Sequence, residues 1–232
     1  MAIDSFVESL AALAADPQRL LDIVGLSLRV SATATVCAAI IGLPMGALVA
    51  LSRSRWRQPT LVVLNALMGL PPVVVGLAVY LLLSRSGPLG FLGWLFTPTG
   101  MVLAQTLLIA PIIAALARQT VEDAHLEYRD WFDSMGLSNI ARVQTLLMET
   151  RFSLLVVLLA GFGRAIAEVG AVMIVGGNIA GATRVMTTSI ALETSKGDLP
   201  MAIGLGAVLL SLVLVINGFA QWVKYWRERY YE

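Results

Sequence analysis

The chain of 232 residues contains a single cysteine, Cys37, and a single histidine, His125. One cysteine excludes a disulfide framework, and the two residues together are too few for the ligand cluster that a metalloenzyme needs. The phosphate-binding pattern GxxxxGK[ST] is also missing from the sequence, so the chain carries no P-loop ATPase motif of its own. We therefore expect a protein that is not an enzyme and that holds no cofactor in this chain.

Charged residues are scarce as well. Lys, Arg, Asp and Glu make up 13% of the chain, and the net charge of +1 gives no indication of nucleic-acid binding. Residues 1–20 contain acids and lack the basic n-region of a cleaved signal peptide. They have the character of a short amphipathic helix at the membrane surface, which we expect to end near Asp16 and Pro17. The remaining residues, 21–232, are then one transmembrane domain.

Apolar residues dominate the chain, at 58%. About 20 helical residues cross a hydrocarbon core of about 30 Å, and the sequence has five apolar runs of that order. The prediction is an all-α membrane protein with five spans, at roughly 22–51, 60–84, 99–117, 152–175 and 199–223. In the second span, Pro71 and Pro72 remove two backbone donors, so either a kink or a broken helix beside a transport pathway fits.

The basic residues predict the orientation of the spans. Ten lysines and arginines fall in the loop after the first span, in the segment 118–151 and in the C-terminal tail, whereas about four fall on the opposite side. By the positive-inside rule, 118–151 and the C-terminus lie in the cytoplasm and the N-terminus lies outside. Five helices make few contacts around a polar solute, so we also expect a homodimer.

The segment 118–151 is a polar island between apolar runs. It holds six of the fifteen acids and the only histidine. Its spacing predicts short helices at 120–128 and 130–135, with Gly136 in the left-handed conformation that ends a helix. Ser138 or Asn139 then caps a third helix at 140–148. A folded, mixed-charge segment between two spans is suited to docking on a cytoplasmic partner.

This island resembles the cytoplasmic loop of permease subunits of ATP-binding-cassette importers, which carry the pattern E-A-A-x-x-x-G. Gly136 stands at the glycine, and the three preceding motif positions are filled by an aspartate and two aromatics in place of Glu-Ala-Ala. Glu149 replaces the proline that usually closes the motif. The resemblance implies a coupling loop at about 119–151 that contacts the ATPase through Asp130, Trp131, Phe132, Ser134, Met135, Gly136, Leu137 and Ser138.

A second stretch is more specific. The run GFGRAIAEVGA at 161–171, followed by GGNI at 176–179 and by 183–198, resembles the molybdate/tungstate permease family, and within it the TupB-type tungstate branch. The resemblance implies the type I importer permease fold and a homodimer in the inner membrane. It also implies two cytoplasmic ATPase subunits, which use magnesium and ATP, and an extracytoplasmic oxyanion-binding protein.

A tetrahedral dianion requires hydrogen-bond donors along its path that hold it without trapping it. Hydroxyl and amide donors gather in the expected loop 176–198, and we expect the pathway to be lined by Asn178, Thr183, Thr187, Thr188 and Ser189. Arg164 and Glu168 are four residues apart in the fourth span, so they should pair on one helix face. A solvated loop is the alternative for the first set, and a purely structural ion pair for the second.

Two questions stay open at this stage. Molybdate or sulfate fits the same chemistry as tungstate, since the sequence cannot separate anions of similar size. A channel or secondary transporter that runs without ATP is the alternative of a different class, although the chain shows no internal repeat of the kind that secondary transporters have.

Overall fold

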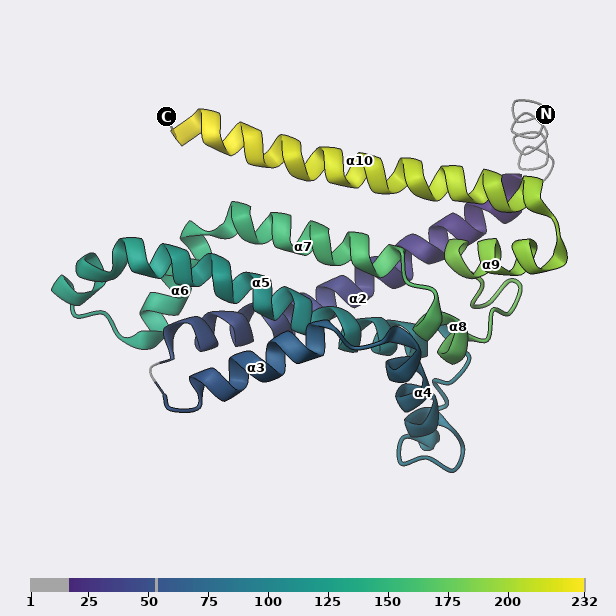
Figure 1. Ribbon diagram of the computed structural model, residues 1–232, viewed down its shortest axis with the longest axis horizontal. Coiled ribbons are helices and arrows are strands. Elements are labelled where there is room, and N and C mark those ends of the chain that lie inside the picture. The colour runs from purple at the N-terminus through teal and green to yellow at the C-terminus, as the bar shows by residue number, and fades with distance from the viewer. Residues whose placement is uncertain (1–16, 53, 232) are drawn as a thin grey trace. The chain divides into compact units, whose positions relative to one another are not determined.

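Residues 17–52 and 54–231 are described by the structure, which is a computed structural model. Figure 1 shows that the chain is built from helices joined by short turns, and the described residues contain no strand. The elements run in the order α2 (Pro17–Leu51), α3 (Arg57–Met68), α4 (Pro72–Leu83), η1 (Gly90–Leu92), α5 (Pro98–Ser134), α6 (Asn139–Glu149), α7 (Arg151–Ile166), α8 (Gly170–Gly176), α9 (Met186–Lys196) and α10 (Leu199–Tyr231). The all-α prediction is confirmed.

Three of these helices, α2, α5 and α10, are long and apolar enough to cross a membrane, and up to five spans result if each of two bent pairs counts as one. One pair is α3 with α4, which meet at a bend of 95° beside Pro71 and Pro72, so of the two alternatives the break fits and a mild kink does not. The other pair is α6 with α7, of which α7 is the apolar member, because α6 carries Asn139, Arg142 and Glu149.

The chain divides into two compact units. Among the described residues, the first contains 17–34, 71–105 and 163–216, and the second contains 35–52, 54–70, 106–162 and 217–231. Glycines allow close approach within each unit. In the second unit, a Cβ on Gly46 of α2 would stand 2.4 Å from the carbonyl oxygen of Ala114 in α5. In the first unit, α4 and α8 lie side by side (Figure 1), and a Cβ on Gly76 would stand 2.7 Å from the Cα of Ala171.

Three expectations about the elements were wrong. The helices expected at 120–128 and 130–135 are the continuation of α5, which runs unbroken from the third span to Ser134. The fourth span is interrupted between α7 and α8. The expected loop 176–198 contains the helix α9. Of the N-terminal segment expected at 1–20, residues 17–20 belong to the first turn of α2, and 1–16 lie outside the described residues.

Candidate functional site

The polar island folds as a helix, a glycine turn and a second helix. α5 ends at Ser134, and Gly136 has a φ of 61°, the left-handed value that the sequence predicted. The amide of Leu137 donates to the carbonyl of Phe132 at 3.3 Å, which closes the end of α5. Ser138 then starts α6, because its Oγ accepts a hydrogen bond of 3.3 Å from the amide of Ala141.

Arg142 holds the two sides of this turn together. Its Nη1 lies 2.8 Å from a carboxylate oxygen of Asp133, its Nε donates to the carbonyl of Leu137 at 3.0 Å, and its Nη2 donates to the carbonyl of Phe132 at 3.3 Å. The guanidinium also lies over the Phe132 ring, 5.9 Å from its centroid. One planar guanidinium therefore binds a carbonyl and a carboxylate in the last turn of α5 and a carbonyl in the turn that follows it. This role of Arg142 depends on the tertiary fold and is not readable from the sequence alone.

The apolar side of the island is packed within the second unit. Phe132 of α5 and Leu146 of α6 are buried together with Val121 and with Ala47 and Ala50 of α2. Leu137 and Tyr128 pack against the same cluster. Of the eight residues expected to contact the ATPase, Phe132 is thus buried and Leu137 half-buried, and the other six are exposed. The two apolar residues support the fold of the loop, and the six exposed ones remain available to a partner.

Several large apolar side chains of the island point away from this cluster. Trp131, Ile140 and Met148 are 70%, 72% and 65% exposed, and Leu126 and Met135 are exposed too. An exposed apolar set on a polar, folded segment indicates a surface that another protein or the membrane covers.

An ion triad anchors the base of the island in the second unit. Glu122 accepts hydrogen bonds from both Arg118, one turn earlier in α5, and Arg57, the first residue of α3. Its two carboxylate oxygens are used separately, one by each arginine. The spacing of Arg118 and Glu122 is readable from the sequence, whereas the contribution of Arg57 depends on the tertiary fold.

In the first unit, Arg164 and Glu168 lie at the interruption between α7 and α8. Arg164 is in the last turn of α7, and its Nη1 is 2.6 Å from Glu168 Oε2. The expectation of one continuous helix face was wrong, because α7 ends at Ile166. Glu168 Oε1 instead accepts from the amide of Ala171 at 3.3 Å, so the carboxylate caps the start of α8. The Glu168 side chain is 5% exposed and that of Arg164 is 41% exposed.

The hydroxyl residues expected along a pathway are largely engaged within the first unit. Thr183 Oγ1 donates to the carbonyl of Gly176 at 2.5 Å and accepts from the amide of Ile179 at 3.0 Å. Thr188 Oγ1 bonds Val185 at the start of α9, and Thr187 Oγ1 donates to the carbonyl of Glu168 at 2.8 Å. These three side chains hold the segment before α9 against the rest of the unit.

Asn178 and Ser189 complete the expected set, and each has an unused oxygen. Asn178 has a φ of 50°, and its side-chain amide donates to the carbonyl of Thr188 at 3.3 Å. Its Oδ1 and the Oγ of Ser189 are buried without a hydrogen-bond partner among the described residues. These two atoms are the members of the set that can accept or exchange a partner.

A small polar cavity brings Glu168 and Thr187, which the sequence indicated, together with Ser27, Ser31 and Gln105, which it did not. It has a volume of about 10 Å³, which is about the size of one water, and its polar lining is Ser27, Ser31, Gln105, Glu168 and Thr187. Gln105 of α5 donates from Nε2 to the carbonyl of Ala165 at 3.0 Å, while its Oε1 is buried without a partner in the described part of the chain. Polar residues this deep in apolar helices indicate a functional position.

Residues 42–229 match the family described as binding-protein-dependent transport system inner membrane component. The tungstate uptake system permease protein TupB of Peptoclostridium acidaminophilum is 44% identical over 202 residues, which cover 87% of this chain and 88% of that protein. TupB of Campylobacter jejuni is 40% identical over 67% of this chain and 65% of its own. The molybdenum transport system permease protein ModB of Mycobacterium tuberculosis is 27% identical over 83% and 76%.

Proposed function

Because the chain belongs to the family of inner membrane components of binding-protein-dependent transport systems, we propose that it is the permease subunit of an ATP-driven importer for tungstate. Two copies form the translocation pathway, two cytoplasmic ATPase subunits drive it, and a separate extracytoplasmic protein delivers the anion. Permease subunits of this family are integral membrane proteins, and the relatives above are transport subunits and not enzymes.

The observation that carries the coupling role is the clamped island with its exposed apolar side chains. Arg142 fixes the turn at Gly136, so α6 and the end of α5 move as one piece. Trp131 and Ile140 stand on either side of that turn and are both exposed. We assign this surface to a groove on the ATPase subunit, since a rigid element with an apolar tip can transmit the movement of a partner that closes on ATP.

Arg164 supports the homodimer. An arginine within a membrane span costs several kcal/mol unless it is paired or hydrated, and Glu168 covers only part of this one, which stays 41% exposed. Lipid cannot hydrate the exposed part. A second copy of the chain or a water-filled path must therefore face it, and a pathway along a dimer interface provides both.

Tungstate is the proposed substrate because two relatives at 40% and 44% identity are named for its uptake. Molybdate is the alternative within this class, since a more distant relative is named for molybdenum transport, and sulfate is a further one. The three anions share the tetrahedral dianion form, so selectivity is expected to reside mainly in the binding protein. The proposed topology keeps the island and the C-terminus in the cytoplasm and the N-terminus outside.

The proposal is tested by uptake into proteoliposomes that contain this chain, its ATPase and its binding protein. Tungstate should enter only when ATP is present on the ATPase side, and molybdate and sulfate are offered as competitors. Uptake that continues with a hydrolysis-deficient ATPase would show a channel or secondary transporter instead.

The coupling role has its own variants. Asp130→Arg reverses a charge on the exposed face of the island, and Gly136→Pro cannot adopt the left-handed φ, so both should release the ATPase in a pull-down and stop uptake. If both variants still bind the ATPase and still transport, the island is not the coupling element.

A further inference from the structure

The first unit contains a basic pocket that includes none of the expected site residues. It has a volume of about 610 Å³ and is formed by the first turns of α2 and by the turn around Gly181 that precedes α9. Three arginines line it, Arg19, Arg29 and Arg184, against a single carboxylate, Asp22. The lining groups therefore carry a net charge of +2.

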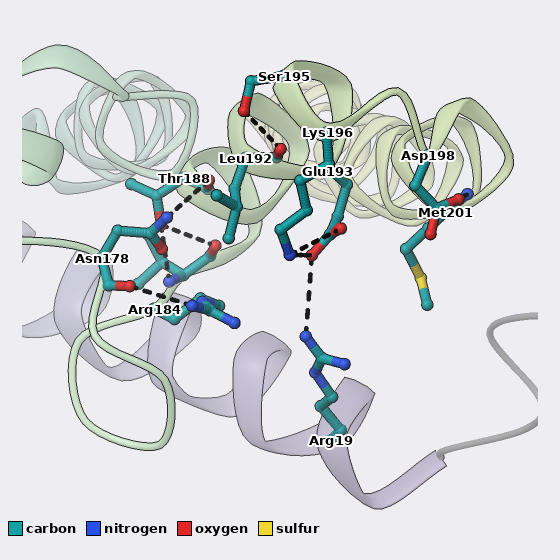
Figure 2. A network of polar contacts seen from close by, with 11 residues as sticks. Arg19, Asn178, Arg184, Thr188, Leu192, Glu193, Ser195, Lys196, Asp198 and Met201 are labelled. Atoms are coloured by element: carbon teal, nitrogen blue, oxygen red, sulfur yellow. Dashed lines mark hydrogen bonds and ion pairs between the residues drawn. The ribbon is translucent and has the colours of Figure 1, made fainter.

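A neighbouring ion pair leaves this charge in place. Figure 2 shows Arg19 and Lys196 directed toward Glu193, at 3.8 Å and 3.1 Å from its Oε1. Glu193 is buried, and Lys196 neutralises it from within the same helix, α9. The contact from Arg19 ties the start of α2 to α9, and the positive balance of the pocket is unchanged.

Two of the three arginines keep donors for a ligand. Arg184 donates from Nη2 to the carbonyl of Asn178 at 3.3 Å, and its Nε is buried without a partner among the described residues. Arg29 is exposed and makes no ion pair with the described residues. A buried, unpaired donor of a charged group is costly, so an anion oxygen that reaches Arg184 would relieve a penalty that the empty chain carries.

We propose that this arginine pocket is an anion-receiving site of the permease itself, which takes the oxyanion from the binding protein before the anion enters the pathway. The inference rests on the proposed function and on its topology, which place the start of α2 on the outer side. A guanidinium presents paired donors that match two oxygens of a tetrahedral dianion. The charge of the pocket equals and opposes that of one such anion.

The size of the pocket indicates how tightly it would bind the oxyanion. A volume of about 610 Å³ is many times the roughly 10 to 15 Å³ that a cavity needs to hold one water, so the anion would keep much of its hydration. Binding that depends on charge and retains water is weak and reversible, as a transit site requires. Such a site should bind tungstate, molybdate and sulfate with similar affinity, because the binding depends on the charge of the anion and not on its size.

The test is tungstate binding to the intact complex of permease and ATPase in phosphatidylcholine nanodiscs, without the binding protein, by equilibrium dialysis with elemental detection. Arg29→Gln and Arg184→Gln should each raise the Kd about tenfold, which corresponds to a dianion about 6 Å from one unit charge in water. Arg85→Gln removes an exposed arginine of the same unit that does not line the pocket, and it should leave the Kd unchanged.

The conservative variants Arg29→Lys and Arg184→Lys separate charge from folding. Both keep the cation, so both should retain most of the binding, and Arg29 makes no ion pair with the described residues that a substitution would break. The same complexes are assayed for retention of the ATPase, which should be equal in all variants.

Three results would overturn the proposal. The first is a wild-type complex that binds no tungstate at millimolar concentration, or glutamine variants whose Kd for tungstate equals that of Arg85→Gln. The second is loss of binding-protein capture with unchanged tungstate binding, which would identify the pocket as a docking contact. The third is displacement of tungstate by phosphatidylglycerol in the nanodisc, which would identify a lipid headgroup site. Each can occur while wild-type uptake still requires ATP, so failure here is distinct from failure of the proposed function.

Discussion

Replacing Arg142 by alanine should loosen the island without unfolding the spans. The side chain is 13% exposed and makes two hydrogen bonds to carbonyls and one ion pair with Asp133. A hydrogen bond from a charged group contributes about 1.5 to 3 kcal/mol. The second bond, at 3.3 Å, is weaker, and the pair with the half-exposed Asp133 adds about 0.2 to 1 kcal/mol. The local stability of the loop should therefore fall by about 2 to 3 kcal/mol.

Hydrogen exchange of the backbone amides of α6 measures this loss directly. Since about 1.4 kcal/mol corresponds to a factor of ten, these amides should exchange about 30 to 150 times faster in the variant. The amides of α10, which belongs to a span, should be unaffected. ATP-driven uptake should fall as well, because a loop that opens cannot transmit force.

Arg129 supplies the matched control. It approaches the same carboxylate, Asp133, at 3.9 Å, but its side chain is 55% exposed. Arg129→Ala should cost less than about 0.5 kcal/mol, which is a change of about twofold in exchange. Arg142→Lys should lie between the two variants, because lysine keeps the charge and loses the planar fork. Equal exchange in Arg142→Ala and Arg129→Ala would show that the clamp does not stabilise the loop.

Three further substitutions test the packing. Gly136→Ala should destabilise the island by about 1 kcal/mol through its φ of 61° alone, since nothing lies within 4 Å of an added Cβ; exchange of α6 measures it, and an Asn variant should be milder. Gly46→Ala should lower the free energy of unfolding by about 1 to 3 kcal/mol, because the new Cβ would overlap the α5 backbone. Gly206→Ala is the control: no atom lies within 4 Å of its added Cβ, so the melting temperature should be unchanged or higher. Ser27→Ala should cost about 1 to 3 kcal/mol in the same melts, because Ser27 Oγ accepts the amide of Met186 at 2.8 Å in a buried position; a melting temperature equal to wild type would contradict that assignment.

Features that depend on a few adjacent residues could be predicted from the sequence. Gly136 was expected in the left-handed region because a glycine followed by a serine cap is a local signal, and the structure has both. The break at Pro71 and Pro72 also follows from a local signal, since proline lacks a backbone N–H donor whatever its surroundings. The apolar runs indicated the candidate spans because length and composition are also local properties of the sequence.

Features that depend on a distant partner could not be predicted. Residues 186–196 are rich in threonine and serine, which are weak helix formers, and α9 exists because Thr188 bonds Val185 and Ser27 accepts the amide of Met186. The fourth span is interrupted without a proline. There, Thr187 Oγ1 donates a hydrogen bond to the carbonyl of Glu168, and the Glu168 carboxylate caps the start of α8. Arg19 and Arg29 of the pocket both belong to α2, but Arg184 lies more than 150 residues further along the chain, so no local spacing relates it to them.

The division into two units bears on how the proposed coupling would work. The chain passes between the units at residues 34–35, 70–71, 105–106, 162–163 and 216–217. Four of these crossings lie inside the continuous helices α2, α5, α7 and α10, and the remaining one lies in the break between α3 and α4. The clamped island belongs to the second unit, and the arginine pocket and the Arg164–Glu168 pair belong to the first. A force received at the end of α5 therefore has an unbroken helix to follow into the unit that would hold the anion, because backbone hydrogen bonds keep a helix stiff along its axis.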